Sequence, residues 1–248
     1  MKKYIYLLIL CILCAGSPLW AYRVDFPDLV FTEKSFSKIG YVINDSSQYQ
    51  AFDIEMKQRR YTEDGVEKLT DEDDNFIVVP SQALIEPGKS QAVTISWVGK
   101  IPVEGDKEQS FRLLVQQLDI AEALENEVFD LHEPKKDEFR AQLTFLINYS
   151  RSSYVKYSKS QPKLEGTLKY YPENKALPLQ FSIENTGTEH LYIKNKVKVQ
   201  LINHPDLKKP ELEFDASGIN LLAGSKRVLY LEWPTALPKD HVYKFVVK

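Results

Sequence analysis

The chain has 248 residues, a formal net charge of −3 and a hydrophobic fraction of 43%, a composition typical of a globular protein. Its two cysteines, Cys11 and Cys14, both lie near the N-terminus, so the remaining chain has neither disulfides nor thiolate metal sites. The slight excess of acidic side chains argues against nucleic acid as a partner, because phosphate backbones attract basic surfaces.

Residues 1–21 have the three regions of a secretory signal: a lysine pair, an apolar run from Tyr4 to Ala15, and a small residue at Ala21. We therefore expect this segment to be removed on export. The exported chain then has 30 basic and 35 acidic side chains and a net charge of −5. The apolar run is shorter than the roughly 20 residues that cross a bilayer, and no similar run follows, so we expect no membrane span.

A lipid anchor on Cys14 is the alternative interpretation of the same segment. Lipidation signals place a small residue directly before the cysteine, and here Leu13 occupies that position. The pattern therefore favours a cleaved signal.

Short runs rich in Val, Ile, Phe, Tyr and Leu follow, separated by turn signals, with almost no helical periodicity. We expect strands over 49–60, 76–79, 92–98, 110–117, 139–149, 179–183, 196–202 and 228–233. Turns are expected at 63–65, 86–88, 185–187 and 223–224, where glycine tolerates positive φ or a side chain captures the backbone. This pattern predicts an all-β protein of antiparallel Greek-key sandwiches with the immunoglobulin-like architecture.

The exported length is large for one sandwich and suits two. Between residues 150 and 166 the alternating pattern gives way to a polar stretch, which suggests a hinge between domains. We place the boundary near Lys156, with one domain over 22–156 and a second over 157–248. A long charged connection over 121–138 precedes the last strand of the first domain, and a loop of that length is commonly functional or mobile.

The segment 139–149 has the longest strict alternation in the chain. One interpretation is a central strand that fills its own core. The other is an edge strand that pairs with a second protein and offers it alternate apolar side chains. Exposed edges also pair with each other, so a self-capping homodimer is a further outcome. The proposed contact residues are Phe139, Ala141, Leu143, Phe145 and Ile147.

The sequence gives little support for a catalytic or metal-binding site. The histidines at 132, 190, 204 and 241 have no metal-ligand spacing, and no nucleophile or phosphate-loop motif accompanies them. The acidic run 71–75 lacks the glycine and final glutamate of a calcium loop. We therefore expect no catalytic residues, no metal site and no cofactor, and a protein that is not an enzyme.

Six segments, in order and spacing, resemble the periplasmic chaperones of the chaperone/usher pilus pathway, the PapD-like family, and most closely its archaic branch. The resemblance covers nearly the whole exported chain. The matching segments are FDIEMKQRRY at 52–61 followed by Asp64-Gly65, FIVVPSQ at 76–82, IEPGKSQAVTISWVG at 85–99, SFRLLVQQL at 110–118, FSIENTGTEH at 181–190 and LAGSKR at 222–227.

The resemblance implies two sandwich domains set at an angle, with a cleft between them, in a protein of the periplasm. It also implies donor-strand complementation, in which the final strand of the first domain, 139–149 here, fills the groove of an incomplete pilin-like subunit. The subunit then passes to an outer-membrane usher. The alternative is a chaperone-like protein that is itself a structural or adhesive surface component.

The chain departs from the family at the basic pair that commonly anchors a subunit's C-terminal carboxylate. Asp28 or Leu29 occupies the position of the family's arginine, and Ile147 or Asn148 occupies the position of its lysine. Either other side chains replace this pair, or the chain binds something other than a standard subunit. The candidates are Arg23, Arg140, Asn148 and Arg151.

A second departure lies at the interdomain salt bridge of the family. Gln109 stands where we place its glutamate, while Arg151 and Asp240 match the two other partners. The resemblance therefore implies an Arg151–Asp240 pair between the domains. Two separately solvated charges are the alternative.

Overall fold

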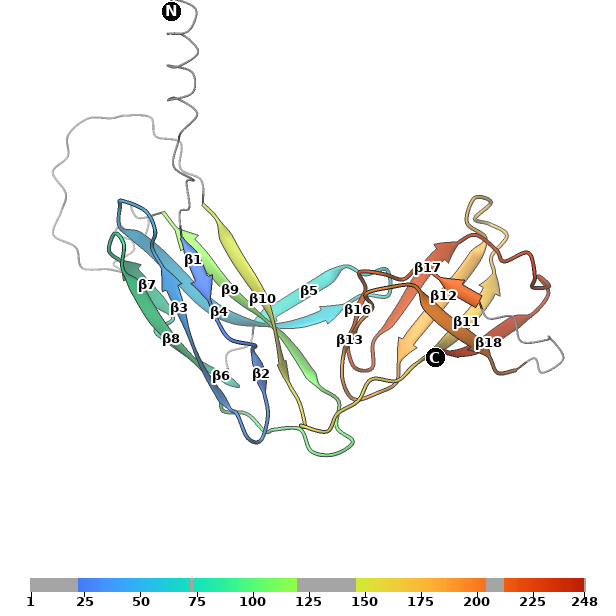
Figure 1. The fold of residues 1–248 in the computed structure, drawn as a ribbon, viewed down its shortest axis with the longest axis horizontal. Helices are drawn as coiled ribbons and strands as arrows, with labels where there is room; N and C mark the ends of the chain where they lie inside the picture. The colour runs from blue at the N-terminus through green and yellow to red at the C-terminus, as the bar shows by residue number, and fades with distance from the viewer. Residues whose placement is uncertain (1–21, 72–73, 120–145, 204–211, 248) are drawn as a thin grey trace, which may run out of the picture.

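The computed structural model describes residues 22–71, 74–119, 146–203 and 212–247, which form two lobes that meet at an angle (Figure 1). Every regular element in these ranges is a β-strand; β1–β10 form the first lobe and β11–β18 the second. The described residues include no helix that is long and apolar enough to cross a membrane. The prediction of an all-β, two-domain fold is confirmed.

The N-terminal lobe is a sandwich of two sheets. One sheet has the order β1-β3-β8-β6, and the other has the order β2-β10-β9-β4-β5, with β7 also paired to β4. Its strands are β1 (Arg23–Asp25), β2 (Val30–Phe31), β3 (Ser37–Ile43), β4 (Gln50–Tyr61), β5 (Glu67–Asp71), β6 (Phe76–Val79), β7 (Gln82–Ile85), β8 (Ser90–Trp97), β9 (Gln109–Leu118) and β10 (Asn148–Val155).

Aromatic side chains dominate the core between these sheets. Phe76 makes edge contacts with Phe31, Trp97 and Phe111, with ring centroids 4.9–5.3 Å apart. Gly40 in β3 lies against the ring of Phe26, which occupies the space that a Cβ would need. Edge-to-face contacts of this kind add to the gain from burying the rings.

The C-terminal lobe has a six-stranded sheet of order β15-β14-β18-β11-β12-β17 and a separate pair, β13-β16. Its buried side chains form a second core that includes Phe181, Tyr243 and Phe245. Its strands are β11 (Leu164–Tyr170), β12 (Leu179–Asn185), β13 (Leu191–Tyr192), β14 (Val197–Leu201), β15 (Leu212–Phe214), β16 (Asn220–Leu221), β17 (Lys226–Leu231) and β18 (Val242–Val247).

A fully buried asparagine organises the same turn in each lobe. Asn44 donates from Nδ2 to the carbonyls of Gln48 (2.7 Å) and Ile85 (2.9 Å), and its Oδ1 accepts from the backbone of Ser46. In the second lobe, Asn185 donates in the same way to the carbonyls of Glu189 and Leu221. Each amide thereby satisfies buried backbone groups that would otherwise be unpaired.

The following turn is also shared. Gly88 and Gly224 both have positive φ, and each donates its N–H to the backbone carbonyl of its lobe's asparagine. Glycine suits these positions because its φ can be positive without strain. The predicted turns at 86–88 and 223–224 are therefore confirmed.

The polar stretch after residue 150 does not begin a hinge, and that part of the prediction is wrong. Residues 148–155 form β10, which pairs with β9 along its whole length. Arg151 and Ser153 occupy positions on the same face as the core residues Tyr149 and Val155, so the strand lacks the apolar alternation that would have marked it. The link between the lobes is residues 156–163.

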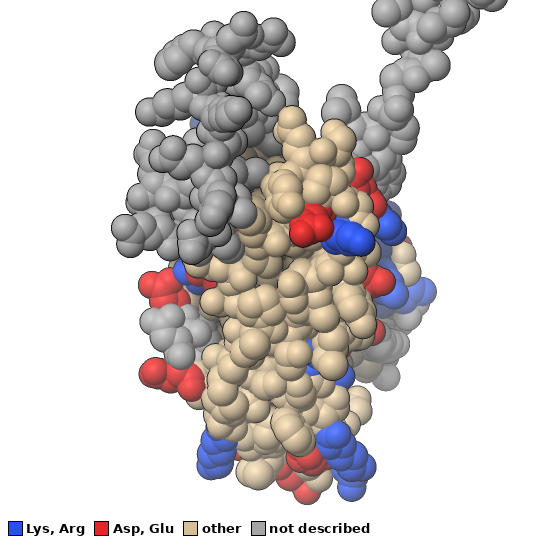
Figure 2. All heavy atoms as spheres, turned by 90° about the vertical axis from the view of Figure 1, so that its left-hand side faces the viewer, with Lys and Arg blue, Asp and Glu red and all other residues tan. Residues whose placement is uncertain are grey.

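One side of the N-terminal lobe has few charges at its centre. Figure 2 shows this face, with Lys, Arg, Asp and Glu side chains gathered at its margins. Large apolar side chains on β3 and β6 are exposed to solvent; they are Ile39, Tyr41, Ile77 and Val79.

Candidate functional site: a free strand edge and the interdomain junction

The outer edge of β10 is open over residues 148–152 in the part of the chain that the structure describes. One side of β10 pairs with β9, and on the other side β2 pairs only with Tyr154 and Val155. The N–H groups of Tyr154 and Lys156 donate to the carbonyls of Leu29 and Phe31, away from β9. Because this direction alternates along a strand, the backbone groups of residues 148, 150 and 152 also point outward.

The crossing segment, residues 26–29, closes this edge at one end. It carries the chain from β1 in one sheet to β2 in the other. Arg151 fixes it by donating to the Phe26 carbonyl and, at 3.0 Å, to Asp28 Oδ1. A strand added along 148–152 must therefore end beside Ser152.

Two apolar side chains precede the open edge. Leu146 and Ile147 are 49% and 48% exposed and lie outside any regular strand. The other predicted contact residues, Phe139, Ala141, Leu143 and Phe145, lie outside the described residues. Of the predicted strand 139–149, only Asn148 and Tyr149 are described as strand.

Tyr22 holds the start of β10. Its hydroxyl donates to the Ile147 carbonyl at 2.8 Å, and its ring packs edge-on against Phe52 with centroids 4.9 Å apart. Burial raises the pKa of Tyr22 to about 12. No local sequence pattern indicates this contact, because it joins residues 125 positions apart.

The predicted carboxylate anchors occupy different places. Arg23 lies in β1, on the sheet opposite β10, and pairs with Asp45 at 2.5 Å. That pairing lowers the pKa of the Asp45 carboxyl. Asn148 is exposed at the start of β10, and Arg151 holds the crossing segment. Arg140 lies outside the described residues.

A guanidinium cluster lies on the outward face of the β10 sheet. Arg59 in β4 donates from Nε to Ser110 Oγ (2.9 Å) and from Nη1 to Ser152 Oγ (2.7 Å). Arg112 in β9, directly opposite Ser152, donates to the same hydroxyl at 3.1 Å and also contacts Glu67. Arg59 is 2% exposed, a burial that sequence patterns do not predict for an arginine.

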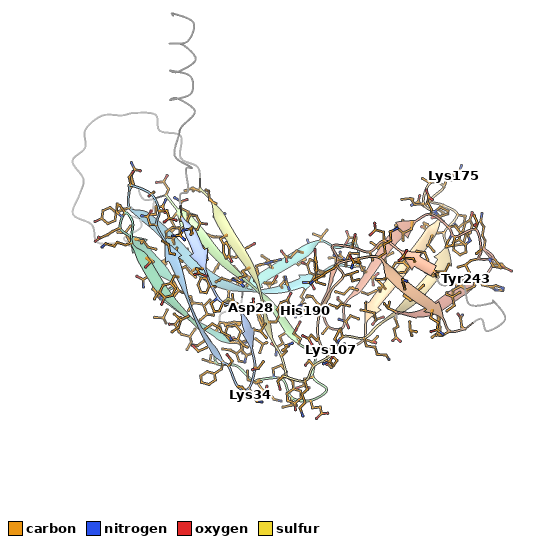
Figure 3. All side chains as sticks on the ribbon, viewed as in Figure 1. Asp28, Lys34, Lys107, Lys175, His190 and Tyr243 are labelled. Carbon is orange, nitrogen blue, oxygen red and sulfur yellow. The ribbon has the colours of Figure 1, made fainter. Side chains whose placement is uncertain are left out.

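His190 lies at the junction of the two lobes (Figure 3). Its ring stacks on Tyr154 with centroids 3.7 Å apart and planes 2° apart, and its Nδ1 lies 2.9 Å from Glu108 Oε2. Asn220 of the second lobe donates to the Tyr154 hydroxyl at 2.9 Å. An aromatic stack and polar contacts thus join the N-terminal lobe to the C-terminal lobe.

A second ionic contact lies beside the first. Lys156 Nζ, directly after β10, contacts Glu189 of the second lobe. One carboxylate oxygen from each of Glu108 and Glu189 and one ring nitrogen of His190 lie within 4.8 Å of one another. The spacing of the histidines predicted an isolated His190, and no local pattern indicates this group, because Glu108 is 82 positions away.

The predicted interdomain pair needs correction. Arg151 contacts the crossing segment of its own lobe, and Asp240 lies 3.7 Å from the adjacent His241 in the second lobe. Beside the position predicted for the glutamate, it is Glu108, one position before Gln109, that contacts His190 of the second lobe. Lys156, rather than Arg151, supplies the cation.

The hairpin of β4 and β5 reaches the second lobe through its tip (Figure 1). The Val228 N–H in β17 donates to the Glu63 carbonyl at 3.0 Å, and Lys226 pairs with the Glu63 carboxylate at 3.3 Å. Arg227 lies over the Tyr61 ring at 5.2 Å. Since β17 is an edge strand of its sheet, the hairpin tip occupies part of that edge.

Solved chaperones of fimbrial systems have this fold. The class 5 fimbriae chaperone CfaA is similar with a TM-score of 0.56 and 15% identity, over 91% of this chain and 92% of CfaA. The chaperone–tip adhesion subunit complex CsuC–CsuE, from archaic Csu pili of Acinetobacter baumannii, is similar with a TM-score of 0.54 and 13% identity. The match covers 91% of this chain and 92% of the matched chain. A chaperone–tip adhesin complex of CFA/I fimbriae is similar with a TM-score of 0.54 and 14% identity, over 86% of this chain and 90% of the matched chain.

Neither a protein-family model nor a curated protein matches the chain. The likeness to solved structures therefore defines a class by fold: the two-domain, all-β fold of PapD-like pilus chaperones. On this fold, the described part of the chain carries an open β10 edge, an arginine cluster on the outward face of the β10 sheet and a junction built on Glu108 and His190.

Proposed function

We propose that this chain is a periplasmic chaperone that binds pilin-like subunits by donor-strand complementation and delivers them to an outer-membrane usher. The observation that carries the proposal is the open edge of β10 over residues 148–152, next to exposed Leu146 and Ile147. Such an edge offers a partner strand a row of hydrogen-bonding groups. The likeness in fold to chaperones solved with tip subunits supports the same proposal.

Apolar side chains ahead of the edge supply the second part of the interaction. A subunit with an incomplete sandwich has an uncovered core, which another chain must fill. Burying Leu146 and Ile147 contributes about 1.5–3 kcal/mol each. The preceding residues Phe139, Ala141, Leu143 and Phe145 extend the same role in the proposal. Binding is non-enzymatic, with no cofactor.

Ser150→Pro tests strand addition. The Ser150 N–H points away from β9, so proline removes a donor for the partner and leaves the β9 ladder intact. We expect the amount of co-purified pilin-like subunit, after periplasmic co-expression, to fall at least about tenfold. Ser150→Ala, which keeps the N–H, is the matched control and should retain the complex.

Folding of the variant is checked separately by circular dichroism and by the thermal midpoint. A folded Ser150→Pro protein that still captures the subunit contradicts strand addition at this edge. Failure of the wild-type protein to capture any pilin-like subunit would favour a structural or adhesive role instead.

A further inference from the structure

A cavity of about 350 Å³ lies at the junction of the two lobes. The N-terminal lobe lines it with residues 58–61 of β4 and 108–110 around the start of β9, and the C-terminal lobe lines it with residues 222–225. Within the described chain, β10 contributes no residue to this lining. Ligand pockets commonly form at such domain interfaces, so the chemistry of the lining decides what this cavity can hold.

Arg59, which lines the cavity, has an unused hydrogen-bond donor. Its Nε donates to Ser110 and its Nη1 to Ser152, but Nη2 is buried and has no partner among the described residues. Only 1% of the Arg59 side chain is exposed. Because Ser110 Oγ accepts from Arg59, its own hydroxyl proton is left as a second donor. Buried donors without partners are costly, so these groups favour a bound acceptor.

Cationic side chains surround the cavity. Arg59 and Arg60 both belong to its lining. Lys107 lies against Gly224, a lining residue of the second lobe, and its Nζ occupies the space that a Cβ on Gly224 would need. Figure 3 labels Lys107 at the junction between the lobes. Positive charge from the first lobe therefore extends to the wall that the second lobe supplies.

The carboxylates near the cavity already have partners. Glu108 is the only carboxylate among the described lining residues, and both of its oxygens lie within 3.0 Å of His190 Nδ1. Glu67 lies 3.9 Å from Arg59 Nη1 and also contacts Arg112, so one carboxylate serves two guanidinium groups. A buried guanidinium with so little compensation of its charge favours a further anion.

We infer that this interlobe cavity binds inorganic phosphate, with Arg59 Nη2 as the main donor. Phosphate is rich in acceptor oxygens, and guanidinium groups bind it through charge-assisted hydrogen bonds. The Ser110 hydroxyl is the second donor to the bound ion. The inference goes beyond the proposed function and does not depend on it, because the open β10 edge does not line the cavity.

Calorimetric titration of the exported chain tests the anion directly. A shift in melting temperature is a poorer measurement, because phosphate also stabilises proteins by being excluded from their surfaces. In a chloride buffer of constant ionic strength, we expect saturable binding of phosphate at one site per chain. Acetate, with a single charge and two acceptor oxygens, should bind at least about tenfold more weakly. Absence of saturable phosphate binding, or equal affinity for acetate, overturns the inference.

A phosphate monoester offers the same donors a similar group, so glycerol 3-phosphate is the next probe. We expect it to bind no more tightly than inorganic phosphate. An affinity more than about threefold higher would assign the cavity to a monoester and overturn the assignment to the free ion.

Ala223→Asp locates the site, and Ala223→Asn is its matched control. Ala223 is a half-buried lining residue on the second lobe, and aspartate and asparagine have nearly the same shape. We expect Ala223→Asp to weaken phosphate binding at least about tenfold, because a carboxylate in the cavity repels the anion. Ala223→Asn should stay within about threefold of the wild type. Equal affinities in the two variants contradict the inference.

Gln109→Glu repeats the charge test at an exposed lining residue, with the wild-type glutamine as the control of equal shape. It keeps the test available if the Ala223 variants do not fold. We expect phosphate binding to weaken at least about tenfold here too. Unchanged affinity in folded Gln109→Glu overturns the inference.

Arg59→Lys tests the main donor. Lysine keeps the charge but lacks the guanidinium fork, so we expect phosphate affinity to fall at least about tenfold in a protein whose circular dichroism is unchanged. Arg60→Lys, at the exposed neighbour, is the matched control and should stay within about threefold of the wild type. Full phosphate affinity in folded Arg59→Lys overturns the role of Nη2.

The outcome is separable from that of the proposed function. Ser150 does not line the cavity, so Ser150→Pro should lose the subunit and keep its phosphate affinity. Retained subunit capture in Ser150→Pro would reject strand addition at that residue without affecting the phosphate site.

Discussion

The two lobes share a turn built on a buried asparagine, but they differ in how their edge strands are covered. Each has a buried asparagine that supports the turn before a positive-φ glycine, Asn44 with Gly88 and Asn185 with Gly224. In the first lobe, however, β10 is open over residues 148–152. In the second lobe, the edge strand β17 is met by the tip of the β4–β5 hairpin. The common turn is therefore a feature of stability, and the open edge distinguishes the lobe that we propose binds a partner.

Removing the shared asparagine should have the largest effect on stability. Asn44→Ala and Asn185→Ala each leave one buried and one part-buried carbonyl without this donor, so we expect each to lower the free energy of unfolding by about 3 kcal/mol. Urea unfolding measures the loss, with Trp97 and Trp233 reporting on separate lobes. Asn203→Ala, at an exposed asparagine that also donates to a carbonyl, should cost less than about 1 kcal/mol.

Equal losses in the two lobes would support the comparison. If Asn44→Ala left the first lobe unchanged while Asn185→Ala destabilised the second, the turns would be alike in geometry only.

The hydrogen bond from Tyr22 to Ile147 holds the start of the open β10 edge. We expect Tyr22→Phe to cost about 1 kcal/mol, because the Ile147 carbonyl loses its hydroxyl donor. The pKa of Tyr22 is raised to about 12 in the folded state, against an ordinary value of 10.0. The unfolded chain therefore releases this proton first, and stability should fall as pH rises from 10 to 12.

Ultraviolet titration of the wild-type protein and of Tyr22→Phe measures the phenolate directly. The difference spectrum should show a tyrosine that ionises near pH 12. Ionisation at its ordinary pH would mean that Tyr22 is not buried against Phe52.

The smallest expected effect concerns the junction between the lobes. Lys156 and Glu189 are 18% and 21% exposed, and we expect a double-mutant cycle of Lys156→Met and Glu189→Gln to give a coupling of about 1 kcal/mol. The matched control is Lys163 and Glu165, which lie 3.9 Å apart and are 68% and 39% exposed. Their coupling should be near zero, and equal couplings would contradict a special role for Lys156.

Local patterns predicted most of the elements that rest on alternation or on glycine. Strand β6 over 76–79 agrees at both ends, and the turn at Gly88 follows from its sequence. Alternation did not reveal β10, because Arg151 and Ser153 lie on its core-facing side, where they donate to backbone carbonyls in place of apolar side chains. The identity of a polar partner across the sheet is not encoded in the strand's own pattern.

The site was harder to predict than the fold for the same reason. Glu108 and His190 are far apart in sequence, and both look like ordinary surface residues until the lobes are joined. Arg59 is part of the family-like segment 52–61, yet its burial depends on β9, β10 and Tyr154. Residues that work through long-range contacts leave no signal in a single sequence.

The main-chain contacts between the lobes have an evolutionary consequence. Glu63 and Val228, and likewise Glu108 and Thr188, are joined by backbone hydrogen bonds of 3.0 Å. A backbone bond is made by any residue except proline on the donor side, so substitutions at these positions leave it in place. Such contacts allow the bend between the lobes to outlast sequence drift, in keeping with a fold that is shared at only 13–15% identity.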